Sequence, residues 1–305
     1  MRGMAARVRL ERLLTERPNR ASRDLDRLSP VRVARLMNRE DQRAVAAVGR
    51  VASRIAEAVT LIARVLGAGG RLFFVGAGTS GRLGVLEAAE CPPTFGTPPE
   101  LVQAIMAGGR ASVFRSREGA EDDARAAARA IRARVRAGDV VVGVSASGVT
   151  PFVRAALAAA AARGAATLLV ACNPKTGVRV RADIVIAPAP GPEVLAGSTR
   201  LKAGTATKLV LNTLTTATMA RLGKVYGNRM VDLQPRSRKL RERALRLVME
   251  LGRVPRARAR RLLASGGSVR VAVVMARTGR SAASARRALE EVGNFLSPLI
   301  GRPST

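Results

Sequence analysis

The sequence predicts an α/β protein built on a doubly wound, mostly parallel β-sheet, with helices before the sheet and a small helical domain after it. Two observations support this fold class. Between residues 72 and 186, short apolar runs that end in small residues alternate with stretches rich in alanine and arginine. Strands and helices that alternate in this way form parallel sheets with helices on both faces. The 305 residues, 47% of them hydrophobic, also suffice for one large domain and an appendage.

A long helix is predicted first, from about Gln42 to Leu66. Its apolar residues recur every three or four positions, namely Val45, Val48, Val51, Ile55, Val59, Ile62 and Val65. The glycine-rich residues 67–70 should end the helix, because glycine is a common helix terminator. The residues before it are Arg-rich and weakly periodic, with breaks expected at Leu28–Pro30 and Met37–Asp41.

Five strands are predicted next, at Leu72–Val75, Leu101–Met106, Val140–Val144, Ala166–Ala171 and Ile184–Ile186. Helices are predicted at Asp122–Arg136, at Pro151–Ala162 and from Leu201 to about Leu222. The remainder is expected to be helical, with interruptions at Gly252, Pro255 and Gly266–Gly267. In an open parallel sheet, ligands bind beyond the carboxyl ends of the strands, so the residues that follow each strand are the candidate site.

Composition excludes several classes of site. The chain has no histidine and only two cysteines, Cys91 and Cys172, so zinc fingers and histidine-based catalysis are excluded. Its 53 basic and 22 acidic residues give a net charge of +31, which favours polyanionic partners. Nucleic acid is nevertheless an unlikely partner, because only 2% of the residues are aromatic and they form no repeating patch with arginine. With neither a membrane span nor a secretory signal in the sequence, we expect a cytoplasmic protein.

The first candidate site follows the first predicted strand. Residues 76–82, Gly-Ala-Gly-Thr-Ser-Gly-Arg, match GxGxxG, whose backbone N–H groups bind anions at a helix N-terminus. Gly78, Thr79 and Ser80 are therefore candidate phosphate-binding residues. A dinucleotide site is disfavoured, because the second strand ends at Met106 without the acidic residue that would hold the ribose. A glycine turn needed only for close packing of strand and helix is the alternative.

A second candidate site follows the third predicted strand, where Ser145-Ala146-Ser147-Gly148-Val149-Thr150 precedes a proline suited to the first turn of a helix. Ser145, Ser147, Gly148 and Thr150 offer hydroxyl and backbone donors that surround a phosphate without a metal. Ordinary capping of the helix by one of the serines is the alternative. Two such loops on neighbouring strand–helix units indicate a phosphorylated small molecule as ligand.

A third concentration of polar residues precedes the helix predicted from Leu201. Glu193, Ser198, Arg200 and Lys202 supply both signs of charge and a hydroxyl group within ten residues. We expect them to bind substrate, and helix capping by Ser198 or its neighbour is the alternative.

Four segments together resemble one family of enzymes. They are Gly76–Gly84, Glu90–Gly96, Glu118–Asp122 and Gly191–Asn212. These segments are similar to those of the N-acetylmuramic acid 6-phosphate etherases, which have the flavodoxin-like sugar-isomerase (SIS) fold. The stretch from Gly197 to Lys202 also resembles the signature of glucokinase regulatory protein. The similarity runs from about Leu14 through the helical tail.

The resemblance implies a lyase that cleaves the D-lactyl ether of N-acetylmuramic acid 6-phosphate by elimination and then water addition. The products would be N-acetylglucosamine 6-phosphate and D-lactate, in the recycling of peptidoglycan sugars. It implies that Glu90 protonates the departing lactate oxygen and that Glu121 takes the proton from C2. Such chemistry needs one protonated and one ionised carboxyl group. The resemblance further implies a homodimer and a reaction with no metal or organic cofactor.

Two other functions stay open. An aldose–ketose sugar-phosphate isomerase would also remove a C2 proton but would need no acid at C3, so Glu90 distinguishes the two enzymes. A non-catalytic sugar-phosphate sensor would need neither glutamate. Without the resemblance, Glu90 is a polar residue near a helix end and Glu121 is one of several acids that stabilise a helix start.

Three regions are expected along the chain. Residues 1–66 form an N-terminal helical region that packs on the core, and residues 67–225 form the SIS domain that binds the sugar phosphate. Residues 226–305 form a C-terminal helical segment that includes a small UBA-like subdomain from about residue 253.

Overall fold

The computed structural model describes residues 13–173, 180–234 and 237–302. The chain divides into two compact units. The first unit comprises Met1–Ala88 and Glu100–Leu214, and the second comprises Ala89–Pro99 and Thr215–Thr305. Each unit has its own buried apolar cluster.

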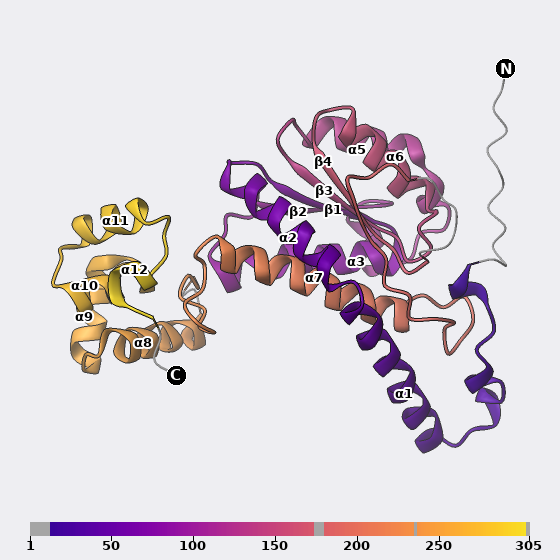
Figure 1. The fold of residues 1–305 in the computed structure, drawn as a ribbon, viewed down its shortest axis with the longest axis horizontal. Helices are drawn as coiled ribbons and strands as arrows, with labels where there is room; N and C mark the ends of the chain where they lie inside the picture. The colour runs from indigo at the N-terminus through magenta and orange to yellow at the C-terminus, as the bar shows by residue number, and fades with distance from the viewer. Residues whose placement is uncertain (1–12, 174–179, 235–236, 303–305) are drawn as a thin grey trace. The chain divides into compact units, whose positions relative to one another are not determined.

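The first unit contains a five-stranded sheet in the order β2-β1-β3-β4-β5 (Figure 1). The strands are β1 (Leu72–Gly76), β2 (Val102–Met106), β3 (Val140–Val144), β4 (Ala166–Val170) and β5 (Ile184–Ile186). Every neighbouring pair is parallel. The chain runs from β1 outward to β2 and then returns past β1 to β3, so the order reverses between β1 and β3. The α/β fold class predicted from the sequence is confirmed.

Helices cover both faces of this sheet. On one face lie α5 (Ala124–Arg134) and α6 (Pro151–Ala161), and on the other lie α2 (Ala52–Gly67), α3 (Gly78–Phe95) and α7 (Lys202–Arg221) (Figure 1). The helices α5 and α6 contact the sheet through small and branched apolar residues such as Ala127, Ile131 and Leu157, which are fully buried against Phe73 and Val141. Alanine-rich helices suit this position because their small side chains let the helix approach the strands closely.

The N-terminal part of the first unit differs from the sequence prediction. Short 3₁₀ turns at Leu14–Glu16, Arg20–Ser22 and Leu25–Arg27 precede α1, which spans Pro30–Gly49. The helix predicted from Gln42 therefore begins twelve residues earlier and breaks near Val51, before α2. Proline is favoured in the first helical turn, which explains the start. The predicted break at Met37–Asp41 was wrong because Glu40 is buried and paired, which an apolar pattern does not register.

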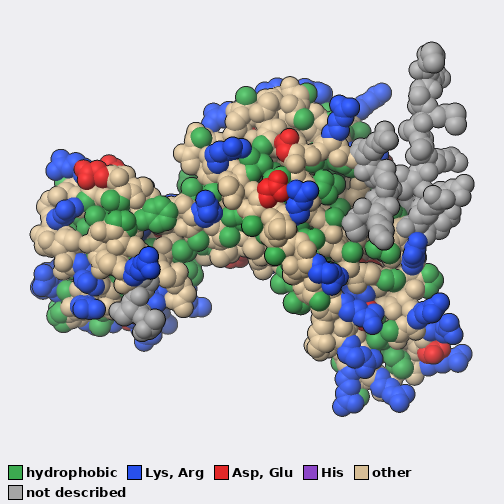
Figure 2. Space-filling model, viewed as in Figure 1, with side chains coloured by type: hydrophobic (Ala, Val, Ile, Leu, Met, Phe, Trp, Pro, Cys, Tyr) green, Lys and Arg blue, Asp and Glu red, His purple; other side chains and the backbone are tan. Residues whose placement is uncertain are grey.

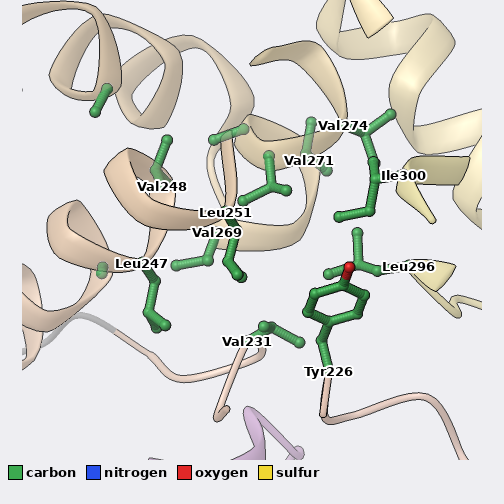
Figure 3. Close-up of a cluster of buried hydrophobic side chains, with 14 of the residues drawn as sticks. Tyr226, Val231, Leu247, Val248, Leu251, Val269, Val271, Val274, Leu296 and Ile300 are labelled. Carbon is green, nitrogen blue, oxygen red and sulfur yellow. The ribbon is translucent and has the colours of Figure 1, made fainter. Parts of the chain in front are cut away.

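The second unit is helical. It contains α8 (Arg238–Gly252), α9 (Arg256–Gly266), α10 (Val269–Thr278), α11 (Ala282–Glu291) and the short α12 (Ser297–Ile300). Ser237, Ser268 and Ser281 each accept a backbone N–H bond and so cap a helix. The helices enclose the apolar cluster drawn in Figure 3, in which Tyr226 also donates a hydrogen bond of 2.8 Å to the carbonyl of Gly301.

Basic side chains dominate the surface. Figure 2 shows lysine and arginine spread over the visible face with few acidic groups among them, and they gather most densely over the segment that leads into α1 and over the first part of that helix. Among the residues that the structure describes, no helix is long and apolar enough to cross a membrane.

At the amino end of the strands, a buried carboxylate ties the sheet edge together. Asp139 precedes β3 and is fully buried. One of its oxygens accepts the backbone N–H of Arg71 at 2.9 Å, and the other accepts the backbone N–H of Arg136 at 2.9 Å and a guanidinium N–H of Arg71 at 2.7 Å. Burial alone would raise the pKa of Asp139, but these hydrogen bonds and the Arg71 charge hold it below its ordinary value.

Asp139→Asn should therefore destabilise the protein by about 2–4 kcal/mol, because it removes an ion pair and leaves a backbone donor facing an amide group. Urea unfolding measures the change. The folded-state pKa of Asp139 is lowered, so its contribution is present above the unfolded pKa of about 3.9 and is lost as pH falls through the folded value. The gap between D139N and unmodified protein should shrink on acidification. Glu57→Gln, at an exposed pair with Arg54, is the control and should cost less than about 1 kcal/mol.

Candidate active site

Three polar segments of the first unit leave the carboxyl edge of the sheet. One follows β1 and comprises Ala77 and the first turn of α3, residues 78–82; one follows β3 at residues 145–150, and one follows β5 at residues 187–201. The first two leave neighbouring strands, since Gly76 is paired with Val144. The sheet order reverses between these two strands, which is where open α/β sheets bind their ligands.

The loop after β1 combines close packing with an open turn. A side-chain carbon on Gly81 would lie 2.6 Å from the carbonyl oxygen of Gly76, so this glycine allows the helix to approach the strand. Gly78 is exposed, has φ +53° and faces open space. Thr79 and Ser80 are half-buried. The packing role therefore explains Gly76 and Gly81, whereas Gly78, Thr79 and Ser80 stay predicted phosphate-binding residues.

The loop after β3 gathers three hydroxyl groups. Ser145 is buried, and its oxygen lies 2.9 Å from that of Thr150 and 3.4 Å from that of Ser147. Backbone N–H groups of Gly148 and Val149 donate to Ser145 and Ser147 at 3.0 and 3.2 Å. Gly148 adopts φ +75°, which closes the turn. The sequence-predicted residues of this loop are thus brought together, and a single anion would meet several donors there.

A cavity of about 120 Å³ opens beside the glycine turn. It is lined by residues that follow β1 and β2, among them Gly78, Ser116, Arg117 and Glu121. Glu121 lies in a 3₁₀ turn, Ala120–Asp122, and is exposed. The structure therefore places the proposed base at the same cavity as the predicted phosphate loop.

The helix that follows Glu121, α5, is capped by a neighbouring residue and not by Glu121 itself. The carboxylate of Asp123 accepts the backbone N–H of Ala126 at 2.8 Å and so caps α5. The alternative explanation for the acidic cluster, stabilisation of a helix start, is thus met by Asp123. Glu121 is left facing the cavity.

Arg82, which the sequence analysis did not select, holds the far wall of this cavity. Its guanidinium donates to the carbonyls of Val113 and Ser112 at 2.7 and 2.9 Å. These two carbonyls belong to the short helix α4 (Ala111–Phe114), which leads into the turn that carries Glu121. The only local signal was the place of Arg82 at the end of the glycine motif.

The loop after β5 ends in a buried charge cluster. Glu193 is fully buried and accepts the backbone N–H groups of Lys202 and Ala203 at 2.9 Å each, so it caps α7. Burial raises the pKa of Glu193, although these two hydrogen bonds act in the opposite direction. Lys202 is also buried, and its ammonium group donates to Glu40 at 2.5 Å. Ser198 is half-buried and Arg200 is exposed.

Glu90 lies on α3 and is exposed. It belongs to the second compact unit, whereas Glu121 belongs to the first. The next residue, Cys91, is buried. The other thiol, Cys172, packs beneath the loops, and burial raises its pKa to about 12, so it stays protonated at neutral pH.

Comparison with known proteins identifies the family. The chain is 53% identical over 268 residues to the N-acetylmuramic acid 6-phosphate etherase of Symbiobacterium thermophilum, a match that covers 88% of this chain and 89% of that protein. It is 54% identical over 286 residues to the protein of the same name from Gloeobacter violaceus, covering 93% and 94% of the two chains. The chain belongs to the N-acetylmuramic acid 6-phosphate etherase family.

Domain matches and solved structures agree with the etherase fold. Residues 54–161 match the glucokinase regulatory protein N-terminal SIS domain, and residues 122–217 match the SIS domain. A phosphoheptose isomerase from Francisella tularensis aligns with a TM-score of 0.50 at 15% identity, over 65% of this chain and 98% of that one. Similarity at this level shows that the two proteins share the SIS fold.

Arg82→Met should lower activity more than stability, because methionine keeps the apolar stem but frees the two carbonyls that fix the wall beside Glu121. The expected loss of unfolding free energy is about 1–3 kcal/mol, measured in urea. Turnover should be measured on the same preparation. Arg129→Met, at an exposed arginine of α5, is the matched control and should change stability by less than about 0.5 kcal/mol. Unchanged turnover in R82M would show that the wall needs no such support.

Proposed function

We propose that this etherase-family protein cleaves the lactyl ether of N-acetylmuramic acid 6-phosphate, giving N-acetylglucosamine 6-phosphate and D-lactate. The observation that carries the proposal is identity above 50% with named etherases along about nine tenths of the chain. The loops at the carboxyl edge of the sheet support it, because they combine backbone and hydroxyl donors for a phosphate with a carboxylate beside them. Recycling of cell-wall amino sugars is the process that such a reaction serves.

The proposed reaction begins with the opened sugar, whose C1 aldehyde acidifies the proton on C2. The Glu121 carboxylate takes that proton, and the electrons of the C2–H bond move toward the C1 carbonyl to form an enolate. As the carbonyl re-forms, these electrons form the C2–C3 double bond and the C3–O bond breaks, and its electrons leave with lactate, whose oxygen receives a proton from the Glu90 carboxyl. Water then adds at C3 and gives a proton to the Glu90 carboxylate, while Glu121 returns its proton to C2. Each carboxyl group thus acts once as acid and once as base.

The hydroxyl loops would hold the phosphate. In our proposal, Thr79 and Ser80 reach it from the glycine turn, and Ser147 and Thr150 reach it from the turn after β3. Ser198 and Arg200 would contact the substrate from the third loop. Hydroxyl and backbone donors bind phosphate with directional hydrogen bonds and do not need a metal for this.

The family resemblance is also the ground for proposing a homodimer that works in the cytoplasm on a sugar phosphate. Analytical ultracentrifugation of the purified protein measures the assembly directly.

The purified protein should release D-lactate from N-acetylmuramic acid 6-phosphate in the presence of a chelator. A coupled D-lactate dehydrogenase assay measures the product. N-acetylmuramic acid without the phosphate is the control and should react far more slowly, because the hydroxyl loops then have no anion to bind. An aldose–ketose isomerase would instead exchange the C2 proton and release no lactate, and that result would overturn the proposal.

Variants of the two glutamates should distinguish removal of the C2 proton from departure of lactate. Glu121→Gln should lose exchange of the C2 proton with deuterated water by at least about a hundredfold, a typical contribution of a general base. Glu90→Gln should lose lactate release by a similar factor but keep C2 exchange, because the base is intact. Exchange of the C2 proton and release of lactate are measured on one sample by mass spectrometry and NMR. Full lactate release by E90Q, or normal exchange in E121Q, would remove the corresponding assignment.

A further inference from the structure

Glu40 is a buried carboxylate to which neither the sequence motifs nor the proposed reaction assigns a role. It lies on α1 and is 2% exposed. One of its oxygens accepts a hydrogen bond of 2.5 Å from the ammonium group of Lys202, which lies 162 residues further along the chain. The same oxygen accepts a bond of 2.8 Å from the side-chain amide of Asn19. Arg43 contacts the second oxygen at 2.9 Å from the exposed side.

Such a pair is costly to bury. The desolvation of two charges offsets most of their attraction, and well-packed apolar residues of similar size would stabilise the fold as well or better. Burial would raise the pKa of Glu40, but the hydrogen bonds from Lys202 and Asn19 lower it below its ordinary value. The carboxylate is thus kept ionised in the interior, and fold stability alone does not account for it.

The Glu40–Lys202 pair lies at the end of the third polar loop. Lys202 is the first residue of α7 and comes soon after Ser198 and Arg200 in the sequence. Asn19, which binds Glu40, also donates to the carbonyl of Pro192 at 3.2 Å, near the other end of the loop. Glu40 therefore connects with both ends of residues 192–202.

The segment around Asn19 supports the same loop at two further points. The hydroxyl group of Ser22 donates to the carbonyl of Val194 at 2.7 Å, and the N–H of Gly197 donates to the carbonyl of Thr15 at 2.9 Å. Both contacts end on backbone carbonyls, and neither involves a charged group. Glu40 is the residue that joins this segment to the start of α7.

We propose that Glu40 is a positioning residue of the lyase: it fixes the two ends of loop 192–202 so that Ser198 and Arg200 are presented to the substrate in one conformation. The inference rests on the proposed function of that loop. Glu40 itself contacts no substrate. A loop held in its binding conformation before the substrate arrives loses less conformational entropy on binding, so the support acts on substrate affinity.

Glu40→Gln tests the inference, because glutamine keeps the size and one acceptor but removes the charge that holds Lys202. We expect KM for N-acetylmuramic acid 6-phosphate to rise about tenfold while kcat falls less than about threefold, the pattern of lost binding. A merely structural role would instead lower the melting temperature and the active fraction, hence the apparent kcat, and leave KM unchanged. Melting curves on the same samples separate the two results.

A second variant keeps the inference testable if E40Q does not fold. Asn19→Ala leaves the Glu40–Lys202 charge pair intact but removes the bonds to Glu40 and to the Pro192 carbonyl, so KM should rise in the same direction by about threefold. Glu57→Gln, an exposed glutamate of α2, is the matched control and should leave KM and kcat unchanged. Values of KM within about twofold of the unmodified protein in N19A, and in E40Q if it folds, would overturn the inference while the proposed function stands. Failure of the unmodified protein to release lactate would contradict the proposed function, and the inference would fall with it.

Discussion

The first unit depends on the parallel pairing of strands whose carboxyl ends lie side by side. Gly76 at the end of β1 pairs with Met106 on one side and with Val144 on the other. Three chain segments with unrelated sequences therefore leave the sheet at one edge, within reach of one small molecule. The amino edge of the sheet is stabilised by the ion pair of Asp139 and Arg71, which joins the starts of β3 and β1. The buried ion pair that supports the sheet and the proposed ligand site thus lie at opposite ends of the strands.

Buried charge has two different uses in this unit. Asp139 satisfies backbone donors at a sheet edge, which is a local function with a direct effect on unfolding. Glu193 and Glu40 lie below a polar loop and hold its ends, one through the backbone of α7 and the other through the side chain of Lys202. A carboxylate can therefore affect substrate binding without contacting the substrate, because it fixes the conformation of the loop that does.

Most of the sheet could be predicted from the sequence, because its strands are short apolar runs that end in small residues and need no distant information. β1, β3, β4 and β5 begin at the predicted residues, and β2 begins one residue later than predicted. The continuation of α1 through residues 37–41 could not be predicted in the same way, since Glu40 counts as polar in any local window and is buried beside its distant partner Lys202. The parts of the structure that were missed are those held by contacts between remote segments.

The candidate site shows the same division. The glycine turn and the serine turn were predicted because each is a contiguous motif at a strand end. The role of Glu121 came from family resemblance, and the structure then separated it from its capping neighbour Asp123. Arg82 was missed because its importance arises from two carbonyls about thirty residues away.

The three hydroxyl groups after β3 have one further consequence. The hydroxyl oxygen of Ser145 lies within hydrogen-bonding distance of those of Ser147 and Thr150, and in each of these two pairs either oxygen is able to act as donor. A hydroxyl hydrogen rotates about its C–O bond, so the same oxygens can satisfy each other in the empty protein and turn their hydrogens outward when an anion arrives. If the turn binds a phosphate as we propose, entry and departure of that anion would require the reorientation of only a few hydroxyl hydrogens.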